Sequence, residues 1–182
     1  MNIDKLQIDV KNIVPCQIKE LKLSCYGCCG RDFKSKEAIL KDLKLNTQDF
    51  KKIKTPSTFR LLQFRDRLSE DPDELTPSGL CSNLVDFGDN CVACPLHNKI
   101  NEVVSKDKFL AIHKKDLRYT HCDVNYECET YIFWNLFSEK QKKEFILWLS
   151  DKGYEKNLYL YSTLNLDGKI VREFMDNMGY KF

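Results

Sequence analysis

Apolar residues along much of this chain recur every three or four positions, which is the spacing of one face of an α-helix. The pattern predicts helices over residues 36–45, 57–68, 125–136 and 139–151, and a last helix that reaches about residue 178. Ser35 and Ser138 stand directly before two of these segments, where a hydroxyl caps the backbone N–H groups of the first turn. Gly153 and Gly179 follow two others, where glycine commonly ends a helix.

Several further segments are shorter or ambiguous. Thr47 is expected to cap a separate short helix, and Asp167 to cap the last helix of the chain. Pro95 predicts a helix over residues 95–104, because proline suits a first helical position. Residues 157–163 suit either a strand or a helix, and residues 3–14 carry a helical stripe that competes with a strand pattern.

Turn-forming residues separate these segments. Residues 71–80 form the clearest loop, and residues 86–90 form a turn. Seven aromatic residues near the C-terminal helices are expected to fill a core: Tyr131, Phe133, Trp134, Phe137, Phe145, Trp148 and Tyr154. The sum predicts a mainly α fold, a single helical domain over residues 1–182 with cysteine-bearing loops between helices and an option for one short strand pair.

Composition narrows the class of protein. The chain has 182 residues, 42% of them hydrophobic, which suits a domain with its own core. Its 29 basic and 27 acidic residues give a net charge of +2, which does not favour a nucleic acid or an anionic membrane as partner. No apolar run approaches the ~18 residues that cross a membrane, and no signal-peptide pattern is visible. We therefore expect a cytoplasmic protein whose thiols stay reduced.

Cysteine carries the chemistry. Eight of the nine cysteines fall into three short groups: Cys25, Cys28 and Cys29; Cys81, Cys91 and Cys94; and Cys122 and Cys128. In a reducing compartment, closely spaced thiols indicate metal binding rather than disulfides. Four thiolates hold one Zn²⁺ ion or one 4Fe–4S cluster, so these eight would suffice for two centres. We expect all eight to be metal ligands.

The choice of ligands follows from local sequence. Cys28 and Cys29 are adjacent, and neighbouring side chains diverge on a strand and lie ~100° apart on a helix, so they more easily serve two centres or two corners of a cluster. Cys16 stands apart and is expected to be a small buried apolar residue, not a ligand. His97 and His121 are reserve ligands. Spacing does not fix which four cysteines share a centre.

A cysteine hydrolase is not expected, and two other classes of function remain as alternatives to a metal-binding protein. Cys122 and Cys128 have acidic neighbours, which raise the pKa of a thiol and disfavour a free nucleophile, whereas a bound cation would reverse the effect. These cysteines are therefore expected to be ligands rather than catalysts of a cysteine hydrolase. The alternatives are an iron–sulfur redox or protein-modification enzyme, which needs an open iron site or a substrate pocket beside the cluster, and a zinc-stabilised interaction module.

Three segments also resemble a known family. The sequence LSCYGCCG over residues 23–30, GLCSNL over 79–84 and CVACP over 91–95 resemble the CxxCxxCC, or YkgJ-type, family of zinc- or iron-chelating proteins. The first segment lacks one upstream cysteine of that family, and its Arg-Pro-x-x-Cys segment is absent. The resemblance implies metal binding and leaves zinc against iron open. A flagellin lysine methylase that resembles the same family is thought to carry an iron–sulfur cluster, but none of its functional residues can be carried over to this chain.

Overall fold

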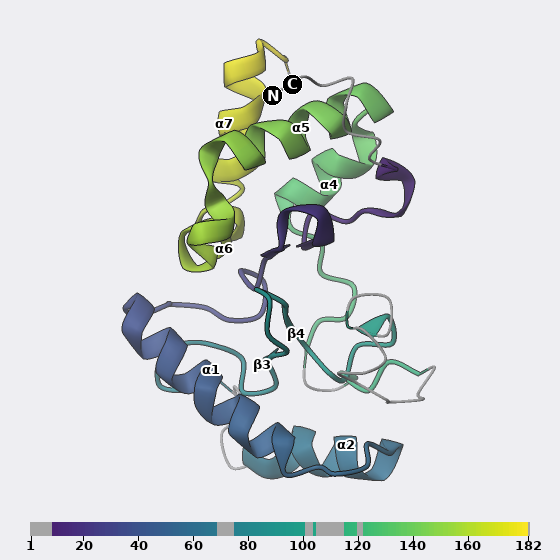
Figure 1. Ribbon diagram of the computed structural model, residues 1–182, viewed down its shortest axis with the longest axis vertical. Coiled ribbons are helices and arrows are strands. Elements are labelled where there is room, and N and C mark those ends of the chain that lie inside the picture. Colours follow the sequence, from purple (N-terminus) through teal and green to yellow (C-terminus); the bar gives the residue numbers. More distant parts are fainter. Residues whose placement is uncertain (1–8, 69–74, 101–103, 105–114, 120–121, 182) are drawn as a thin grey trace. The chain divides into compact units, whose positions relative to one another are not determined.

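The computed structural model describes residues 9–68, 75–100, 104, 115–119 and 122–181 (Figure 1). The chain forms two compact units. Residues 1–28 and 127–182 form one, called here the terminal unit, and residues 29–126 form the other, called the central unit. Two such units can belong to one domain, so the expectation of a single domain stays a prediction. Each unit is described by itself.

Helices dominate the described residues, which confirms the mainly α fold. The α-helices are α1 (Lys36–Lys51), α2 (Thr58–Arg65), α4 (Glu129–Leu136), α5 (Glu139–Lys152), α6 (Leu158–Leu166) and α7 (Lys169–Met178). Short 3₁₀ helices cover Val10–Asn12, Lys19–Leu21, Asp66–Leu68 and Tyr154–Lys156. Two antiparallel strand pairs join β1 (Gln17–Ile18) to β2 (Leu23–Ser24) and β3 (Val85–Asp86) to β4 (Val92–Ala93), where the sequence suggested room for one.

The predicted helix caps are largely confirmed. The Ser35 hydroxyl accepts a hydrogen bond from the amide of Ala38 at 3.3 Å and begins α1. Ser138 begins α5 in a capping box with Gln141, in which each side chain accepts a hydrogen bond from the other residue's backbone amide. Gly153 ends α5 with a φ of 67°, a left-handed conformation in which glycine has no Cβ penalty. Local sequence therefore decides where these helices begin and end.

Two predicted caps were wrong. Thr47 lies inside α1, which continues past it, and its hydroxyl donates to the Leu43 carbonyl at 2.7 Å. The same hydroxyl accepts a hydrogen bond from the amide of Asp86 at 2.9 Å, so Thr47 ties α1 to β3 instead of starting a helix. At the last helix, Gly168 rather than Asp167 occupies the N-cap position, with a φ of 65°.

Other boundaries differ from the periodic pattern. Residues 157–163 belong to helix α6, which Asn157 caps. The helix predicted over 125–136 begins only at Glu129, and residues 95–99 form turns rather than a helix. The predictions for residues 3–8, 71–74 and 101–103 lie outside the described residues, as does the histidine at position 121.

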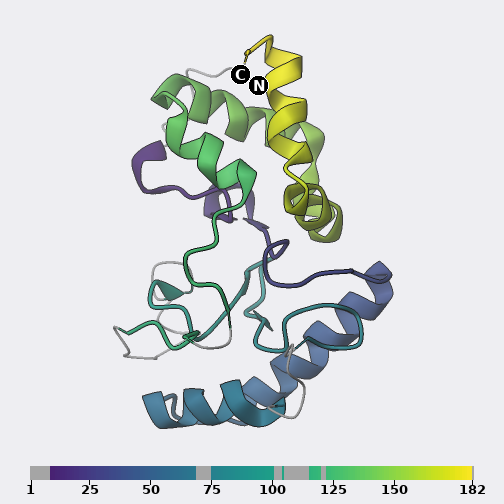
Figure 2. The same cartoon turned by 180° about the vertical axis from the view of Figure 1, so that it is seen from behind.

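An aromatic core holds the terminal unit together. Its buried rings are carried by α4, the residue after α4, α5, α6 and α7, and include Trp134, Phe137, Phe145, Tyr161 and Phe174. Figures 1 and 2 show the course of these helices. The predicted core aromatics Phe133 and Trp148 pack against this core while partly buried. Two hydrogen bonds fix the N-terminal segment on these helices, because Trp134 Nε1 donates to the Ile13 carbonyl at 3.1 Å and the Tyr161 hydroxyl to the Pro15 carbonyl at 2.8 Å.

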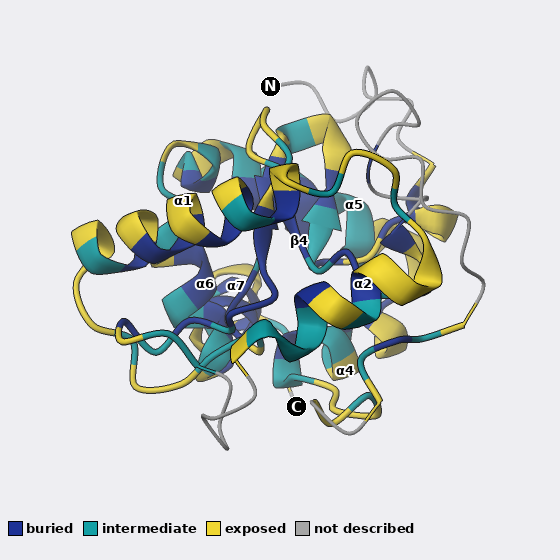
Figure 3. Ribbon diagram, turned by 90° about the horizontal axis from the view of Figure 1, so that it is seen from below, coloured by how far each residue is buried: buried dark blue, intermediate teal, exposed yellow. Residues whose placement is uncertain are grey.

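The central unit has its own core, formed where α1 and α2 meet the β3–β4 pair. Its buried members include Phe50, Leu61, Phe64, Val85 and Leu96, and Figure 3 shows α1 with buried and exposed residues on opposite faces. Arg67 joins these parts, because its guanidinium donates to Asn46 Oδ1 at 3.1 Å and to the Ser82 carbonyl. This partly buried arginine therefore holds the backbone just after Cys81 in place.

Asp42 links α1 to the backbone before Cys81 and makes stability depend on pH. Burial alone would raise the pKa of Asp42, but hydrogen bonds from Thr76 and Ser78 lower it below its ordinary value; the Ser78 amide lies 2.9 Å from Asp42 Oδ2. The charged form therefore favours the folded state.

We expect Asp42→Asn to lower the free energy of unfolding above the ordinary aspartate pKa of about 4. The difference from wild type should shrink as the pH falls through the lower, folded pKa, because both side chains are then neutral. Urea unfolding between pH 3 and 7 measures it, with Lys44→Gln on the exposed face of α1 as the control, because Lys44 does not contribute to the pKa shift of Asp42. A difference that stays constant over this range would contradict the role of the Asp42 charge.

Candidate metal centres

The two units divide the nine cysteines between them. The terminal unit contains Cys16, Cys25, Cys28 and Cys128, and the central unit contains Cys29, Cys81, Cys91, Cys94 and Cys122. All nine lie in described residues and none forms a disulfide. The division falls between Cys28 and Cys29, the adjacent pair whose side chains were expected to serve two centres or two corners of a cluster.

In the terminal unit, the β1–β2 pair places two cysteines face to face. Its register opposes Gln17 to Ser24 and Ile18 to Leu23. The next step along this register opposes Cys16 to Cys25, and the Cys25 amide donates to the Cys16 carbonyl at 2.9 Å. Directly opposed residues of an antiparallel pair project their side chains to the same face, with Cβ atoms ~4.5–5.5 Å apart. The two thiols therefore share one face of the hairpin.

The loop that follows β2 is packed closely on α6. The Tyr26 amide donates to Ser162 Oγ at 3.0 Å, and a Cβ added at Gly27 would collide with the Ser162 carbonyl. Only glycine fits at that point, between Cys25 and Cys28. The Gly27 amide also donates to Cys25 Sγ at 3.4 Å, which is the geometry of an amide that stabilises a thiolate.

Cys128 completes this group from a distant part of the sequence. It is the N-cap residue of α4, where backbone N–H groups point outward, and the Tyr131 and Thr130 amides favour its thiolate. Its pKa is nevertheless raised, by burial first and also by Cys28. A bound cation would reverse that effect.

The other thiols of the terminal unit show the same pattern. Burial raises the pKa of Cys16, and the neighbouring Cys25, Cys28 and Cys128 raise it further. Burial likewise raises the pKa of Cys25, with Cys28 the next cause. Four thiols that hinder one another's ionisation lie within one electrostatic neighbourhood. A metal cation is the charge that would stabilise their thiolates.

The central unit repeats the opposed pair. Gly30 faces Leu80 in an antiparallel bridge, the Cys81 amide donates to the Cys29 carbonyl at 2.8 Å, and the Arg31 amide donates to the Gly79 carbonyl at 2.9 Å. This register opposes Cys29 directly to Cys81, as Cys16 is opposed to Cys25 in the other unit. Two cysteines far apart in sequence are thus brought face to face.

Further thiols join the central group. Cys91 and Cys94 flank β4 and pack against the core of the unit. Burial raises the pKa of Cys94, and Cys81 and Cys122 raise it further, while Arg118 opposes them. The Arg118 guanidinium lies 4.0 Å from Cys122 Sγ.

Arg118 itself is held by Asp116, with an Nη2 to Oδ2 distance of 2.7 Å. Burial alone would lower its pKa, but the hydrogen bonds to Asp116, the Asp116 charge and the nearby Cys122 and Cys94 sulfurs raise it. The central thiols therefore already have one cationic neighbour.

Neither group is a finished coordination sphere. Within the described residues, no set of three or more His, Cys, Asp or Glu side chains is placed so that it could already hold a metal ion. A metal ion bound by either group would therefore need its sulfur ligands to lie closer together than they do in this structure. Of the reserve ligands, His97 accepts a hydrogen bond from the Lys99 amide at its Nδ1, at 3.0 Å.

Two buried hydroxyls fit a thiolate acceptor. Ser82 Oγ and Thr130 Oγ1 are among the three buried side-chain atoms in the described residues for which no hydrogen-bond partner is found. Ser82 directly follows Cys81, and Thr130 stands two residues after Cys128. An unsatisfied buried hydroxyl costs ~1–3 kcal/mol, whereas a metal-bound thiolate accepts hydrogen bonds. Each of these two hydroxyls thus stands within two residues of a cysteine of one group.

Cys16 lies in a setting that its sequence did not indicate, because it is half-buried and close to another cysteine. Its isolation in the sequence predicted a small apolar residue, but the β1–β2 hairpin opposes it to Cys25. The Ser24 hydroxyl donates a hydrogen bond to Gln17 Oε1 at 2.9 Å, which is a further contact between the two strands of the hairpin.

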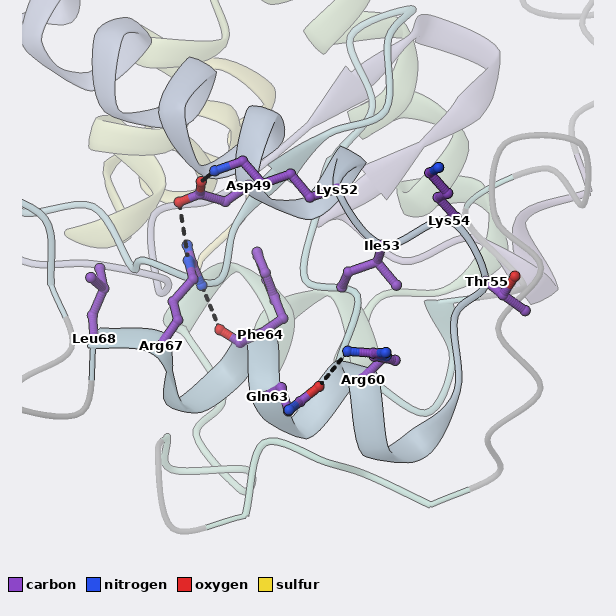
Figure 4. A pocket seen from close by; sticks show the side chains of 10 residues that line it. All are labelled: Asp49, Lys52, Ile53, Lys54, Thr55, Arg60, Gln63, Phe64, Arg67 and Leu68. Atoms are coloured by element: carbon purple, nitrogen blue, oxygen red, sulfur yellow. Dashed lines mark hydrogen bonds and ion pairs between the residues drawn. The ribbon is translucent and has the colours of Figure 1, made fainter.

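The described cavities lie away from the cysteines. One of about 690 Å³ is lined by α1, α2 and the segment between them (Figure 4). Several of its charges are already paired, since Asp49 binds Lys52 at 2.7 Å and Arg67 at 3.4 Å. A second cavity of about 740 Å³ is lined by α1, the segment that follows it and residues 85–88. Neither is lined by a cysteine.

Comparisons with protein-family models, with curated proteins and with solved structures gave no match to this chain. The resemblance to the CxxCxxCC family therefore stays a prediction from the sequence. Among the described residues, no helix combines the length and the apolar character needed to cross a bilayer.

Gly27→Ala tests the packing that holds the loop between Cys25 and Cys28. We expect it to cost about 1–3 kcal/mol of stability, because the added methyl group displaces the loop from α6. The displaced loop should also expose Cys25, so that this thiol reacts faster with a soluble disulfide reagent. Urea unfolding and the rate of thiol reaction measure the two effects.

Gly153→Ala is the matched control, because its methyl group would meet open space and only the left-handed φ opposes it. Faster thiol reaction in Gly153→Ala, or none in Gly27→Ala, would contradict the packing described here.

Proposed function

We propose that this protein binds metal through cysteine thiolates, with one centre in each unit. Each centre would be a Zn²⁺ ion or a 4Fe–4S cluster, the two groups that thiolates hold in fours. The observations that carry the proposal are the direct opposition of Cys29 to Cys81 across antiparallel backbone in the central unit, and the gathering of Cys25, Cys28 and Cys128 in the terminal unit.

The ligands expected from the sequence divide between these centres. The terminal centre would use Cys25, Cys28 and Cys128, and the central centre would draw its ligands from Cys29, Cys81, Cys91, Cys94 and Cys122. Adjacent Cys28 and Cys29 would then serve different centres. The buried hydroxyls of Thr130 and Ser82 support the same division, because one stands beside a cysteine of each group.

The raised pKa values of the thiols also support a bound cation in each of the two cysteine groups. Burial and neighbouring thiols raise the pKa of Cys16, Cys25 and Cys94, so their thiolates need a positive charge that the fold supplies only in part. A metal ion supplies that charge and binds the segments that carry the ligands. In a small fold whose strand pairs are two residues long, this binding contributes directly to folding.

The protein is therefore proposed to be a cytoplasmic metal-binding protein, since nine cysteines without disulfides suit a reducing compartment. A zinc ion would tie the loops to the helices, and a cluster would add the ability to carry an electron. The iron–sulfur redox or protein-modification enzyme stays a prediction from the sequence, because neither described cavity adjoins a cysteine.

Elemental analysis of protein purified without air tests the proposal. We expect about two zinc ions per chain, or about eight iron atoms with a matching amount of acid-labile sulfide and a brown colour, for two centres. Cys28→Ser and Cys91→Ser should each lower the metal content, and Leu136→Ser, at an exposed residue of α4, should not.

A wild-type chain without stoichiometric metal would contradict the proposal. Full metal content in both Cys28→Ser and Cys91→Ser would contradict the ligand assignment.

A further inference from the structure

One cysteine outside the expected ligand set lies in the midst of the terminal group. Cys16 immediately precedes β1, and the hairpin register opposes it to Cys25 through the hydrogen bond between the Cys25 amide and the Cys16 carbonyl. Its side chain is half-buried, as are those of Cys25 and Cys128. It shares the terminal unit with these two and with Cys28.

We propose that Cys16 is the fourth thiolate of the terminal centre, so that Cys16, Cys25, Cys28 and Cys128 form a complete four-cysteine site within this unit. This inference rests on the proposed function, and it names the ligand that makes the terminal site closed. A site with four protein ligands has no open coordination position for a substrate. The terminal centre would therefore be structural or carry electrons, and would not bind a reacting group.

The face of the hairpin supports this assignment. Side chains alternate between the two faces of a strand, so Cys16 and Cys25 share their face with Ile18 and Leu23, not with the Gln17–Ser24 pair. Ile18 and Leu23 are buried in the core of the terminal unit, and Cys25 packs against that core. The two cysteines thus face the helices of the unit, α4 among them, whose N-cap residue is Cys128.

The fold also fixes the backbone on which Cys16 stands. The Tyr161 hydroxyl, on a fully buried side chain, donates to the carbonyl of Pro15 at 2.8 Å. On the other side of Cys16, the Gln17 side chain accepts a hydrogen bond from Ser24 Oγ at 2.9 Å. A metal ligand needs such a held backbone, because a site with loose ligands binds metal weakly.

Electrostatics agree with this geometry. The thiols that raise the pKa of Cys16 after burial are Cys25, Cys28 and Cys128, the three other members of the proposed site. The hydroxyl of Tyr161 has a raised pKa through burial and then through Cys25 and Cys16, so it lies in the same neighbourhood. Cys16 therefore lies in the same electrostatic neighbourhood as the three other thiols of the proposed site.

Metal content of full-length variants tests the inference. In protein purified without air, we expect Cys16→Ser and Cys25→Ser each to lose the metal of the terminal centre and keep that of the central one. The double variant should lose no more than either single variant, because both remove the same centre. Cys94→Ser should lose the metal of the central centre instead. Gln17→Ala, which breaks the hairpin's side-chain hydrogen bond without removing a thiol, should keep both.

If Cys16→Ser keeps its full metal content while Cys25→Ser loses metal, the inference is overturned and the proposed function stays intact. Equal loss from Gln17→Ala would also overturn it, because hairpin integrity rather than the Cys16 thiol would then be responsible. A wild-type chain without metal would instead refute the proposed function itself.

Alkylation of the wild-type chain gives a test that needs no variant. We expect iodoacetamide to modify Cys16 at least tenfold more slowly in metal-loaded protein than after chelation, as peptide mass spectrometry would show. An equal rate in the two states would overturn the inference, because burial alone would then account for the reactivity of Cys16.

Discussion

The proposed metal centres depend on backbone pairings that bring partly buried thiols together, where burial and neighbouring sulfur atoms disfavour ionisation of each thiol. Antiparallel pairing opposes Cys16 to Cys25 and Cys29 to Cys81, so each unit gathers sulfur atoms from segments that are separate in sequence. Burial and proximity then raise the pKa of these thiols, as for Cys25. In the central unit Arg118 partly offsets the rise in the pKa of Cys94, and in both units a bound metal cation would favour the thiolate form.

The helices were the predictable part of the fold, because their signals are local. Ser35, Ser138 and Gly153 fixed helix ends through hydrogen bonds and backbone conformations within a few residues. The errors arose where a distant segment decided the outcome. Thr47 was expected to cap a helix, but its hydroxyl accepts a hydrogen bond from the amide of Asp86. The two residues are 39 positions apart, so no local pattern shows this contact.

The candidate sites could be predicted only in part for the same reason. The close spacing of eight cysteines indicated metal ligands, but their division between two units depends on pairings such as Cys29 with Cys81, which join distant positions. Cys16 was set aside because strands of two residues, such as β1 and β2, have too little alternation to be recognised. The spacing of cysteines in the sequence indicates which residues could bind metal. Only the backbone pairing of distant segments shows which of these cysteines lie close together.

The central claim is that cysteine sulfur atoms of each unit converge on a bound metal. X-ray absorption at the metal edge of anaerobically purified protein tests it most directly. The account predicts sulfur as the nearest scatterer, about four atoms per metal at ~2.3 Å, with an added iron–iron contribution if the metal is a cluster. A metal surrounded mainly by nitrogen and oxygen, or no bound metal at all, would contradict it.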